Sequence, residues 1–475
     1  MPLLVDATGV LNWGAQPPTG IQRVEFALCK AALEDKRANL VAFDRGSGYF
    51  APLTDRERDY LRYIVDGCWE EYGDLRQAQW RFADLQLKYF SNEGARRLAA
   101  SLTGKRSGAC YSLFKTVIRF AQWIALAARR VGAGFAVLVR KPSAHDISRL
   151  VLLCHHTNRK RGLDKALRAC DLKPVFLIHD VIPVTDPELA APHVVRSMRG
   201  LFERVMLREE RIIAISHATR DALLQWNDAA LRTPYRREVP VARLGAALLD
   251  IDGADAPVVA LEDRPFALYC STFEKRKNHP FLLEVWQRLI ETHGDSVPHL
   301  ALVGRPSNTF AQVQRMLVAA PALAAKVHLL TDLGDPELRW AYRNARFGLF
   351  PSSAEGWGLG VAECLANGLP VLHSNVPALN EAAQDLMPAL DVCSHDDWVR
   401  AIGGILCEDK LDELRSRAGQ YRRGGSNAFA NEVFAHMEAI AAGEDAASRA
   451  VDIHQPLILD LANGQGSANR VDIGG

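Results

Sequence analysis

FPSSAEGWGLGVAECLANGLPVLHS, residues 350–374, is the most informative segment of the sequence. An apolar run leads into a glycine-rich turn, a helical segment follows, and a second apolar run closes the stretch. The pattern predicts strand, turn, helix and strand. The free N–H groups at the start of such a helix favour an anion such as a phosphate. Glu355 and Glu363, eight positions apart, could hold hydroxyl groups on either side of it. The alternative is a packing turn with two solvated acids.

The alternation of short apolar runs with helical patterns extends over most of the chain. The predicted strands are residues 3–6, 39–44, 149–155, 175–179 and 211–216 in the first half, and 266–271, 299–304, 327–330, 347–350 and 370–373 in the second. Strands that alternate with helices predict parallel βαβ units. We therefore expect an α/β protein with two Rossmann-like, doubly wound domains that face a central cleft. Ligands of such sheets bind at the carboxyl ends of the strands.

Four segments resemble one protein family. EGWGLGVAE (355–363) resembles the E-x7-E signature of the family-4 retaining glycosyltransferases, which share the GT-B fold. Three further segments resemble the same family in the expected order: VFLIHDVIP (175–183), CSTFEKRKNHPFLLEVW (270–286) and LTDLGDPELRWAYRNARFGLFPS (330–352). The resemblance implies a GT-B fold and transfer of a sugar from a nucleotide donor with retention at the anomeric carbon.

The predicted organisation has four parts. They are an N-terminal, acceptor-side domain at 1–258 with a helical insertion at about 50–148, a C-terminal nucleotide-sugar domain at 259–425, a helix at 426–445 and a tail at 446–475. The resemblance implies that the helix crosses back onto the N-terminal domain. The tail is polar and glycine-rich, so we expect it to be flexible.

The resemblance assigns three catalytic roles. Glu355 is implied to be the carboxylate nearest the transferred sugar. His179, with Asp180 beside it, is implied to hydrogen-bond a sugar hydroxyl. Lys277 is implied to neutralise the departing diphosphate, a task that suits a cation fixed after a strand. The alternatives are a histidine satisfied by local backbone and, for EKRKN, a solvated charged turn.

The resemblance also implies a donor-binding set. Its members are Arg276, Gly356, Gly358, Leu359, Gly360, Glu363, Gly20 and Leu333. Glu363 is implied to bind the ribose hydroxyls, and Gly20, in the loop with Thr19 and Ile21, is implied to lie against the donor phosphates. The glycine turn and Leu359 are implied to supply backbone N–H groups, and Leu333 lies in the implied base-binding loop.

Two positions depart from the family pattern. Ser271 stands where many members carry an arginine, so Arg276, Arg243 or the serine itself is expected to supply that donor. Gly360 stands where a proline is common, so we expect a looser turn there.

Residues 94–145 contain ten basic residues and no Asp or Glu, interleaved with aromatic and aliphatic side chains. One interpretation is a helix that lies on an anionic membrane surface. A second is a helical insertion packed on the N-terminal domain, and a third is a basic track for an acidic polysaccharide or a lipid diphosphate.

Composition excludes several classes of protein. The formal charge of +1 over 475 residues argues against nucleic acid as a partner. The nine cysteines form no C-x-x-C pair, which favours a reducing compartment and argues against structural zinc. No signal peptide or run of ~20 apolar residues is evident, so we expect a cytoplasmic protein, with the inner face of the membrane as the alternative. No metal or other cofactor is required, because the helix terminus and lysine can neutralise the diphosphate.

The predicted function is hexose transfer by a glycosyltransferase, with mannose from GDP-mannose as the first choice. The predicted acceptor is a lipid-linked glycan or polysaccharide in surface glycan synthesis. Two alternatives stay open: a nucleotide-sugar epimerase of GT-B fold, and a non-catalytic subunit that binds nucleotide sugars.

Overall fold

The computed structural model describes residues 3–11, 20–44, 49–66, 149–154, 162–245 and 254–443. The basic segment 94–145, Thr19 and the tail 446–475 lie outside the described residues, so the predictions made for them stay predictions.

The N-terminal domain is built on a six-stranded sheet with the order β3-β2-β1-β4-β5-β6. Its strands are β1 (Leu3–Asp6), β2 (Ala38–Asp44), β3 (Tyr49–Pro52), β4 (Arg149–Leu153), β5 (Leu172–Ile178) and β6 (Arg211–Ala214). Its helices are α1 (Thr8–Leu11), α2 (Gly20–Glu34), α3 (Asp55–Val65), α8 (Leu163–Ala169), α9 (Ile182–Thr185), the 3-10 helix η2 (Pro187–Leu189), α10 (Pro192–Leu207) and α11 (His217–Ala230). The pairs from β2 through β1, β4 and β5 to β6 are parallel, as the βα alternation predicts.

The helical insertion predicted at about 50–148 was placed to start too early in the sequence. Residues 49–66 belong to the domain, because β3 pairs antiparallel with β2 and α3 packs against α2. Helix α3 starts at a capping box in which Thr54 and Glu57 bond each other's backbone N–H groups. An antiparallel edge strand that directly follows its neighbour in sequence does not fit the βαβ alternation, which is why the pattern missed it.

The C-terminal domain repeats the architecture with the strand order β12-β11-β10-β7-β8-β9. Its strands are β7 (Phe266–Cys270), β8 (His299–Val303), β9 (Val327–Leu330), β10 (Phe347–Phe350), β11 (Val371–Ser374) and β12 (Ala389–Leu390). Its helices are the 3-10 helices η3 (Lys275–Lys277) and η4 (Gly294–Ser296), and α12 (His279–His293), α13 (Phe310–Ala319), α14 (Pro321–Ala324), α15 (Asp335–Asn344), α16 (Leu359–Ala366), α17 (Pro377–Ala383), α18 (His395–Ile405) and α19 (Glu408–Ala418). The five strands predicted for this half are confirmed.

Both sheets have the strand order of the Rossmann fold. Counted from its own first strand, each runs 3-2-1-4-5-6 in space, so the order reverses between β1 and β4 and between β7 and β10. A sheet of this kind binds ligands beside that reversal, in the loops that follow the two adjacent strands. The loops after β7 and β10 are therefore the expected floor of a site in the C-terminal domain.

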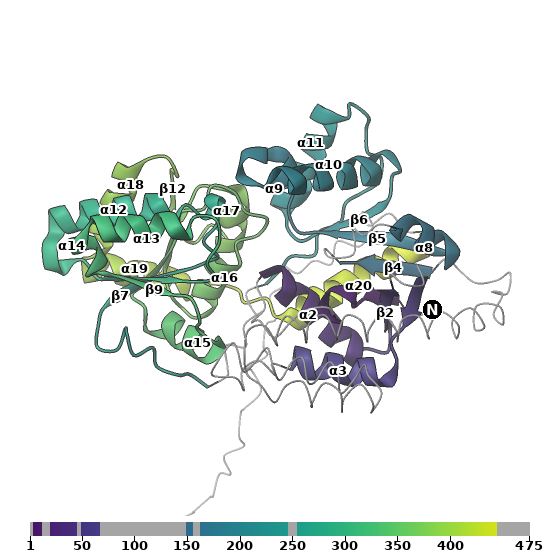
Figure 1. Cartoon of the computed structure of the whole chain (residues 1–475), viewed down its shortest axis with the longest axis horizontal. Coiled ribbons are helices and arrows are strands. Elements are labelled where there is room, and N and C mark those ends of the chain that lie inside the picture. The colour runs from purple at the N-terminus through teal and green to yellow at the C-terminus, as the bar shows by residue number, and fades with distance from the viewer. Residues whose placement is uncertain are drawn as a thin grey trace, which may run out of the picture.

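Helix α20 (Ser426–Ala442) ends the described part of the chain and lies in the N-terminal lobe (Figure 1). It packs against α2 and against β1, β4 and β6. Phe429, Val433, Phe434 and Met437 form its buried face. Because α20 follows the C-terminal domain in sequence but packs in the N-terminal one, the two lobes share one continuous set of buried side chains.

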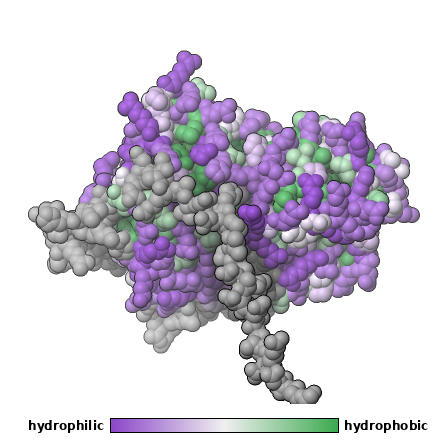
Figure 2. Space-filling model, turned by 180° about the vertical axis from the view of Figure 1, so that it is seen from behind, coloured by the Kyte–Doolittle hydropathy of each residue, from purple (hydrophilic) through white to green (hydrophobic). Residues whose placement is uncertain are grey.

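The surface seen from behind is largely hydrophilic, with hydrophobic residues in small groups (Figure 2). In the described part of the chain, no helix combines the length and the apolarity needed to span a bilayer.

Candidate active site

The loops after β7 and β10 are tied together at the point where the strand order reverses. The Ser353 N–H donates to the Arg276 carbonyl oxygen at 2.8 Å, and the Arg276 guanidinium donates to the Ala354 carbonyl oxygen at 3.2 Å. The hydroxyl of Tyr269, on β7, donates to the Lys277 carbonyl oxygen at 2.6 Å. Backbone carbonyls thus fix where the two cationic side chains begin.

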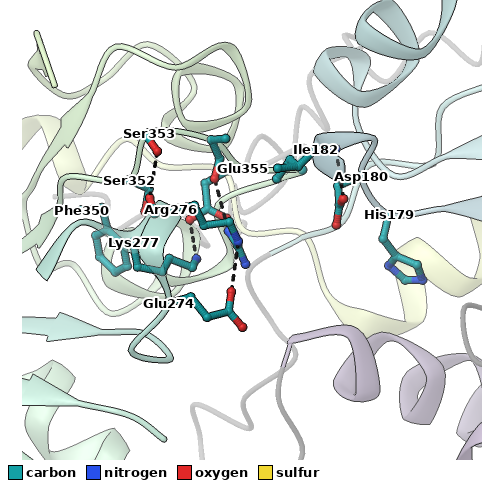
Figure 3. Close-up of polar contacts among 12 residues, drawn as sticks. His179, Asp180, Ile182, Glu274, Arg276, Lys277, Phe350, Ser352, Ser353 and Glu355 are labelled. Carbon is teal, nitrogen blue, oxygen red and sulfur yellow. Dashed lines mark hydrogen bonds and ion pairs between the residues drawn. The ribbon is translucent and has the colours of Figure 1, made fainter. Parts of the chain in front are cut away.

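Arg276 and Lys277 converge on Glu355. Arg276 Nη1 donates to Glu355 Oε2 at 2.6 Å, and Lys277 Nζ donates to the other oxygen, Oε1 (Figure 3). Arg276 also reaches Glu274 at 3.1 Å through Nε. The Glu355 side chain is only 8% exposed. We call Arg276, Lys277 and Glu355 the charged cluster.

Burial alone would raise the pKa of Glu355, but the two neighbouring cations outweigh it and hold the pKa at about 2. Burial and the adjacent Arg276 lower the pKa of Lys277, against the opposing effect of Glu355. The carboxylate therefore stays ionised. A phosphate that entered here would meet two cations that share the Glu355 carboxylate, with Glu274 also paired to Arg276.

The glycine turn places the start of α16 beside the charged cluster. Gly358 is the residue before the helix and has a φ of 117°, a left-handed conformation that favours glycine. A Cβ there would lie 2.7 Å from the Leu379 side chain. The N–H groups of the first helical turn have no intrahelical acceptor, which makes this end of α16 suitable for an anion.

Glu363 lies in the second turn of α16, on the far side of the glycine turn from Glu355. Its side chain is buried, and Oε2 accepts the Tyr342 hydroxyl at 2.6 Å. Burial raises the pKa of Glu363 to about 7, against the opposing effects of Arg23 and the Tyr342 hydrogen bond. Two buried carboxylates on one turn thus have opposite pKa shifts.

The N-terminal domain touches the glycine turn at Gly356. The Gly356 carbonyl oxygen accepts Ser216 Oγ at 2.6 Å and Thr219 Oγ1 at 2.9 Å. A Cβ on Gly356 would lie 2.0 Å from the His179 carbonyl oxygen. Only a glycine permits this approach, so the turn that bears Glu355 is also a domain contact.

A second contact joins α17 to α11. The two Glu381 carboxylate oxygens accept the N–H groups of His217 and Ala218, each at 3.0 Å. Ser216, the residue before α11, bonds the Thr219 N–H in the usual capping geometry. The C-terminal domain therefore supplies a carboxylate to the positive end of an N-terminal-domain helix.

The structure brings most of the predicted residues to this one region. Those on the turn or beside it are Glu355, Arg276, Lys277, Gly356, Gly358, Leu359, Gly360 and Glu363. Gly20 begins α2, and a Cβ on it would lie 3.7 Å from the Leu359 side chain. Leu333 precedes α15 and packs against the core.

The backbone of His179 lies beside Gly356, but its side chain points in another direction. Its imidazole is buried and points away from the charged cluster, whereas the carboxylate of Asp180 points towards it (Figure 3). Burial raises the pKa of Asp180, while Arg276 acts in the opposite sense.

The structure also addresses the two departures from the family pattern. Arg276 provides the second cation beside Lys277, whereas Arg243 is exposed and its backbone N–H bonds Glu432 at 3.1 Å. At Gly360 a Cβ would meet the Phe350 ring at 2.3 Å, and the looser turn expected there stays a prediction. The aromatic ring fills the space that the missing side chain leaves.

Three residues of this region escaped sequence reasoning: Arg23, Asp335 and Tyr342. Tyr342 and Asp335 stand in the segment that resembles the base-binding loop, and Arg23 follows the Gly20 loop, so each is near a recognisable motif. Nothing in their spacing indicates that they meet. Among the described residues, no group of three His, Cys, Asp or Glu side chains is arranged to hold a metal ion.

Residues 264–408 match the family model for group 1 glycosyl transferases. Serotype-specific mannosyltransferase WbdA of Escherichia coli is 25% identical over 230 residues, which are 46% of this chain and 28% of WbdA. O-antigen chain mannosyltransferase B of Escherichia coli is 27% identical over 254 residues, 52% of this chain and 65% of that protein. The chain thus spans less than a third of WbdA.

Two solved structures share the fold at 14% identity and a TM-score of 0.54. Anabaena HepE, in complex with UDP and glucose, aligns over 92% of this chain and 100% of that chain. The α,α-trehalose 6-phosphate synthase of Burkholderia multivorans aligns over 95% and 99%.

The paired Rossmann-like sheets and these structural likenesses define a protein of the GT-B fold. Over residues 264–408 the chain resembles the group 1 glycosyl transferases.

Proposed function

We propose that this protein is a retaining glycosyltransferase that moves a hexose from a nucleotide sugar to a glycan acceptor. The observation that supports it most is the charged cluster beside the start of α16, at the reversal point of the C-terminal sheet. A diphosphate needs cations and N–H donors, a sugar needs a carboxylate for its hydroxyls, and one turn of the chain offers all of these.

The proposed reaction breaks the bond between the anomeric carbon and the diphosphate oxygen and forms a bond to an acceptor hydroxyl on the same face. Lys277, Arg276 and the start of α16 stabilise the negative charge on the departing nucleotide. The leaving phosphate oxygen takes the proton of the acceptor hydroxyl. Glu355 holds sugar hydroxyls and stabilises the cationic character of the anomeric carbon. No metal is needed, because protein groups neutralise the diphosphate.

The proposed donor is GDP-mannose, and the proposed acceptor is a lipid-linked glycan or polysaccharide of the cell surface. The support is similarity to WbdA and to O-antigen chain mannosyltransferase B, which are named as mannosyltransferases. The proposed location is the cytoplasm, with contact to the inner face of the membrane through residues 94–145. Neither the membrane contact nor a basic track for an acidic acceptor falls within the described residues.

Thermal unfolding in the presence of GDP-mannose, UDP-glucose, UDP-N-acetylglucosamine, GDP and UDP tests the donor. A ligand that binds the native state at 100 times its dissociation constant stabilises it by about 2.7 kcal/mol. We expect GDP-mannose and GDP to raise the midpoint most. A larger shift with a uridine donor would contradict the choice of base and sugar.

Product analysis tests the reaction class. With the stabilising donor and a lipid-linked glycan extract, we expect free nucleotide to appear in step with a product that retains the donor's anomeric configuration. Epimerised donor without acceptor would instead identify an epimerase. Nucleotide-sugar binding with neither product, over a panel of acceptors, would indicate a non-catalytic subunit.

A further inference from the structure

A buried ion pair joins the two domains on the Glu363 side of the glycine turn. Both terminal nitrogens of Arg23, on α2, donate to the Asp335 carboxylate, with distances of 2.5 and 3.1 Å. The side chains are 11% and 8% exposed, and they are 312 positions apart in sequence. A two-pronged arginine–carboxylate pair fixes orientation as well as distance.

Asp335 is linked to Glu363 through helix α15. It is the first residue of α15, directly after Leu333 and Gly334, and Tyr342 on the same helix donates to Glu363. Electrostatic effects of Arg23 extend to both Asp335 and Glu363. The guanidinium is therefore bonded to the first residue of α15 and lies within electrostatic range of Glu363 on α16.

Helix geometry explains why this arginine reaches the other domain. Gly20 and Arg23 are three positions apart on α2 and so lie on one face of the helix. Gly20 faces Leu359 at the start of α16, which brings Arg23 to the neighbouring Asp335. The same face of α2 thus touches the glycine turn and the α15 loop.

We propose that Arg23 is a positioning residue for the nucleoside end of the donor: it fixes Asp335 at the start of α15, the helix whose Tyr342 bonds Glu363, so that nucleoside binding requires both domains. This inference rests on the proposed function, because it assumes a nucleoside diphosphate as the ligand.

The charge state of Glu363 gives the proposal a specific signature. The groups that act on it are Arg23 from α2 and Asp335 and Tyr342 from α15, and, besides burial, Glu363 in turn raises the pKa of Cys270 on β7 and of Cys364 beside it on α16. A carboxylate that accepts two ribose hydroxyls must be ionised. Burial raises the pKa of Glu363 to about 7, Arg23 opposes that rise, and Asp335 adds to it. Loss of Arg23 therefore moves the pKa up, and loss of the Asp335 charge moves it down.

Calorimetric titration of the full chain with GDP and UDP, from about pH 5.5 to 8.5, tests the proposal. We expect wild-type affinity for the preferred nucleotide to rise as Glu363 ionises. Arg23→Ala should bind at least tenfold more weakly at pH 7, with the midpoint of its pH profile displaced to higher pH. Arg23→Lys should recover part of the affinity. Asp335→Asn should also bind more weakly, but with its midpoint displaced to lower pH.

The two variants should displace the midpoint of the pH profile in opposite directions. A loss of folding would instead change binding in the same way in both variants. Arg346→Ala is the matched control, because its ion pair with Glu408 lies within the C-terminal domain, and it should bind like wild type. If Arg23→Ala does not fold, Asp335→Asn decides the matter, and an unmoved or raised midpoint would overturn the inference.

Failure of this inference and failure of the proposed function would give different results. Wild-type affinity and pH profile in Arg23→Ala would overturn this inference and leave the proposed function intact. Absence of binding of either nucleotide to wild type would overturn both.

Discussion

The two ends of the glycine turn present the same residue type in opposite electrostatic surroundings. At one end, Glu355 bonds two cations and its pKa is about 2. At the other, Glu363 bonds the Tyr342 hydroxyl, the cation that opposes its pKa rise is paired with Asp335, and its pKa is about 7. Burial acts on both in the same direction, so the neighbours decide the outcome. Under the proposed function, the end that holds the sugar and phosphates is permanently charged and the end that holds the nucleoside is proton-sensitive.

The largest expected effect comes from the charged cluster. Glu355→Gln and Lys277→Ala should each lower sugar transfer by on the order of 10²–10³-fold, because each removes a charge that stabilises the transition state. Initial rates of nucleotide release measure it, with circular dichroism to check the fold. Glu408→Gln, an exposed ion-paired glutamate on α19, is the control and should transfer at the wild-type rate. Unchanged transfer by both site variants would refute the site.

The second-largest expected effect is on stability and tests the raised pKa of Glu363. The pKa of Glu363 is raised from 4.5 to about 7 in the folded state, so folding retains a proton that the unfolded chain releases. This contribution to stability is full below the unfolded pKa and is lost as the pH rises through the folded one. In Glu363→Gln, the fall in the free energy of unfolding from pH 5 to 8 should shrink by on the order of 3 kcal/mol. Urea unfolding across that range measures it, and parallel profiles for both proteins would contradict the raised pKa.

A smaller effect is expected where the turn meets the N-terminal domain. Gly356→Ala places a methyl group against the His179 carbonyl oxygen, so the domains must shift, at a cost of about 1–3 kcal/mol. Thermal unfolding and transfer rate should both fall. Gly200→Ala is the matched control, since nothing lies within 4 Å of its Cβ position on α10, and it should be neutral or slightly stabilising. Equal behaviour of the two variants would contradict the close approach.

The smallest effect should come from the carboxylate that caps α11. Glu381→Ala leaves the His217 and Ala218 N–H groups without this acceptor and should lower stability by about 1 kcal/mol. Denaturant unfolding measures it. Because the Glu381 carboxylate bonds α11 and not the charged cluster, the transfer rate at low temperature should change little. A loss of transfer with unaltered stability would show that the contact acts on catalysis instead.

Sequence reasoning predicted much of the C-terminal domain and less of the N-terminal one. The strands at β7 to β11 are short apolar runs bounded by turn residues, so their periodicity is visible. Strand β3 and helix α3 were missed because an antiparallel edge strand interrupts the βα alternation. Within the site, Glu355 and Lys277 stand in recognisable motifs, whereas Asp335 and Glu381 act through partners that no spacing reveals.

The two doubly wound sheets and the positions of the glycine turn, its glutamates and its lysine were predictable from the amino-acid sequence, because they follow from local periodicity and from motifs a few residues long. The folded molecule was needed to see that Arg23 pairs with Asp335, that His179 turns its ring away, and that Glu355 and Glu363 have opposite pKa shifts. Those outcomes depend on burial and on charges from segments hundreds of positions apart, and neither quantity is a property of a local stretch of chain.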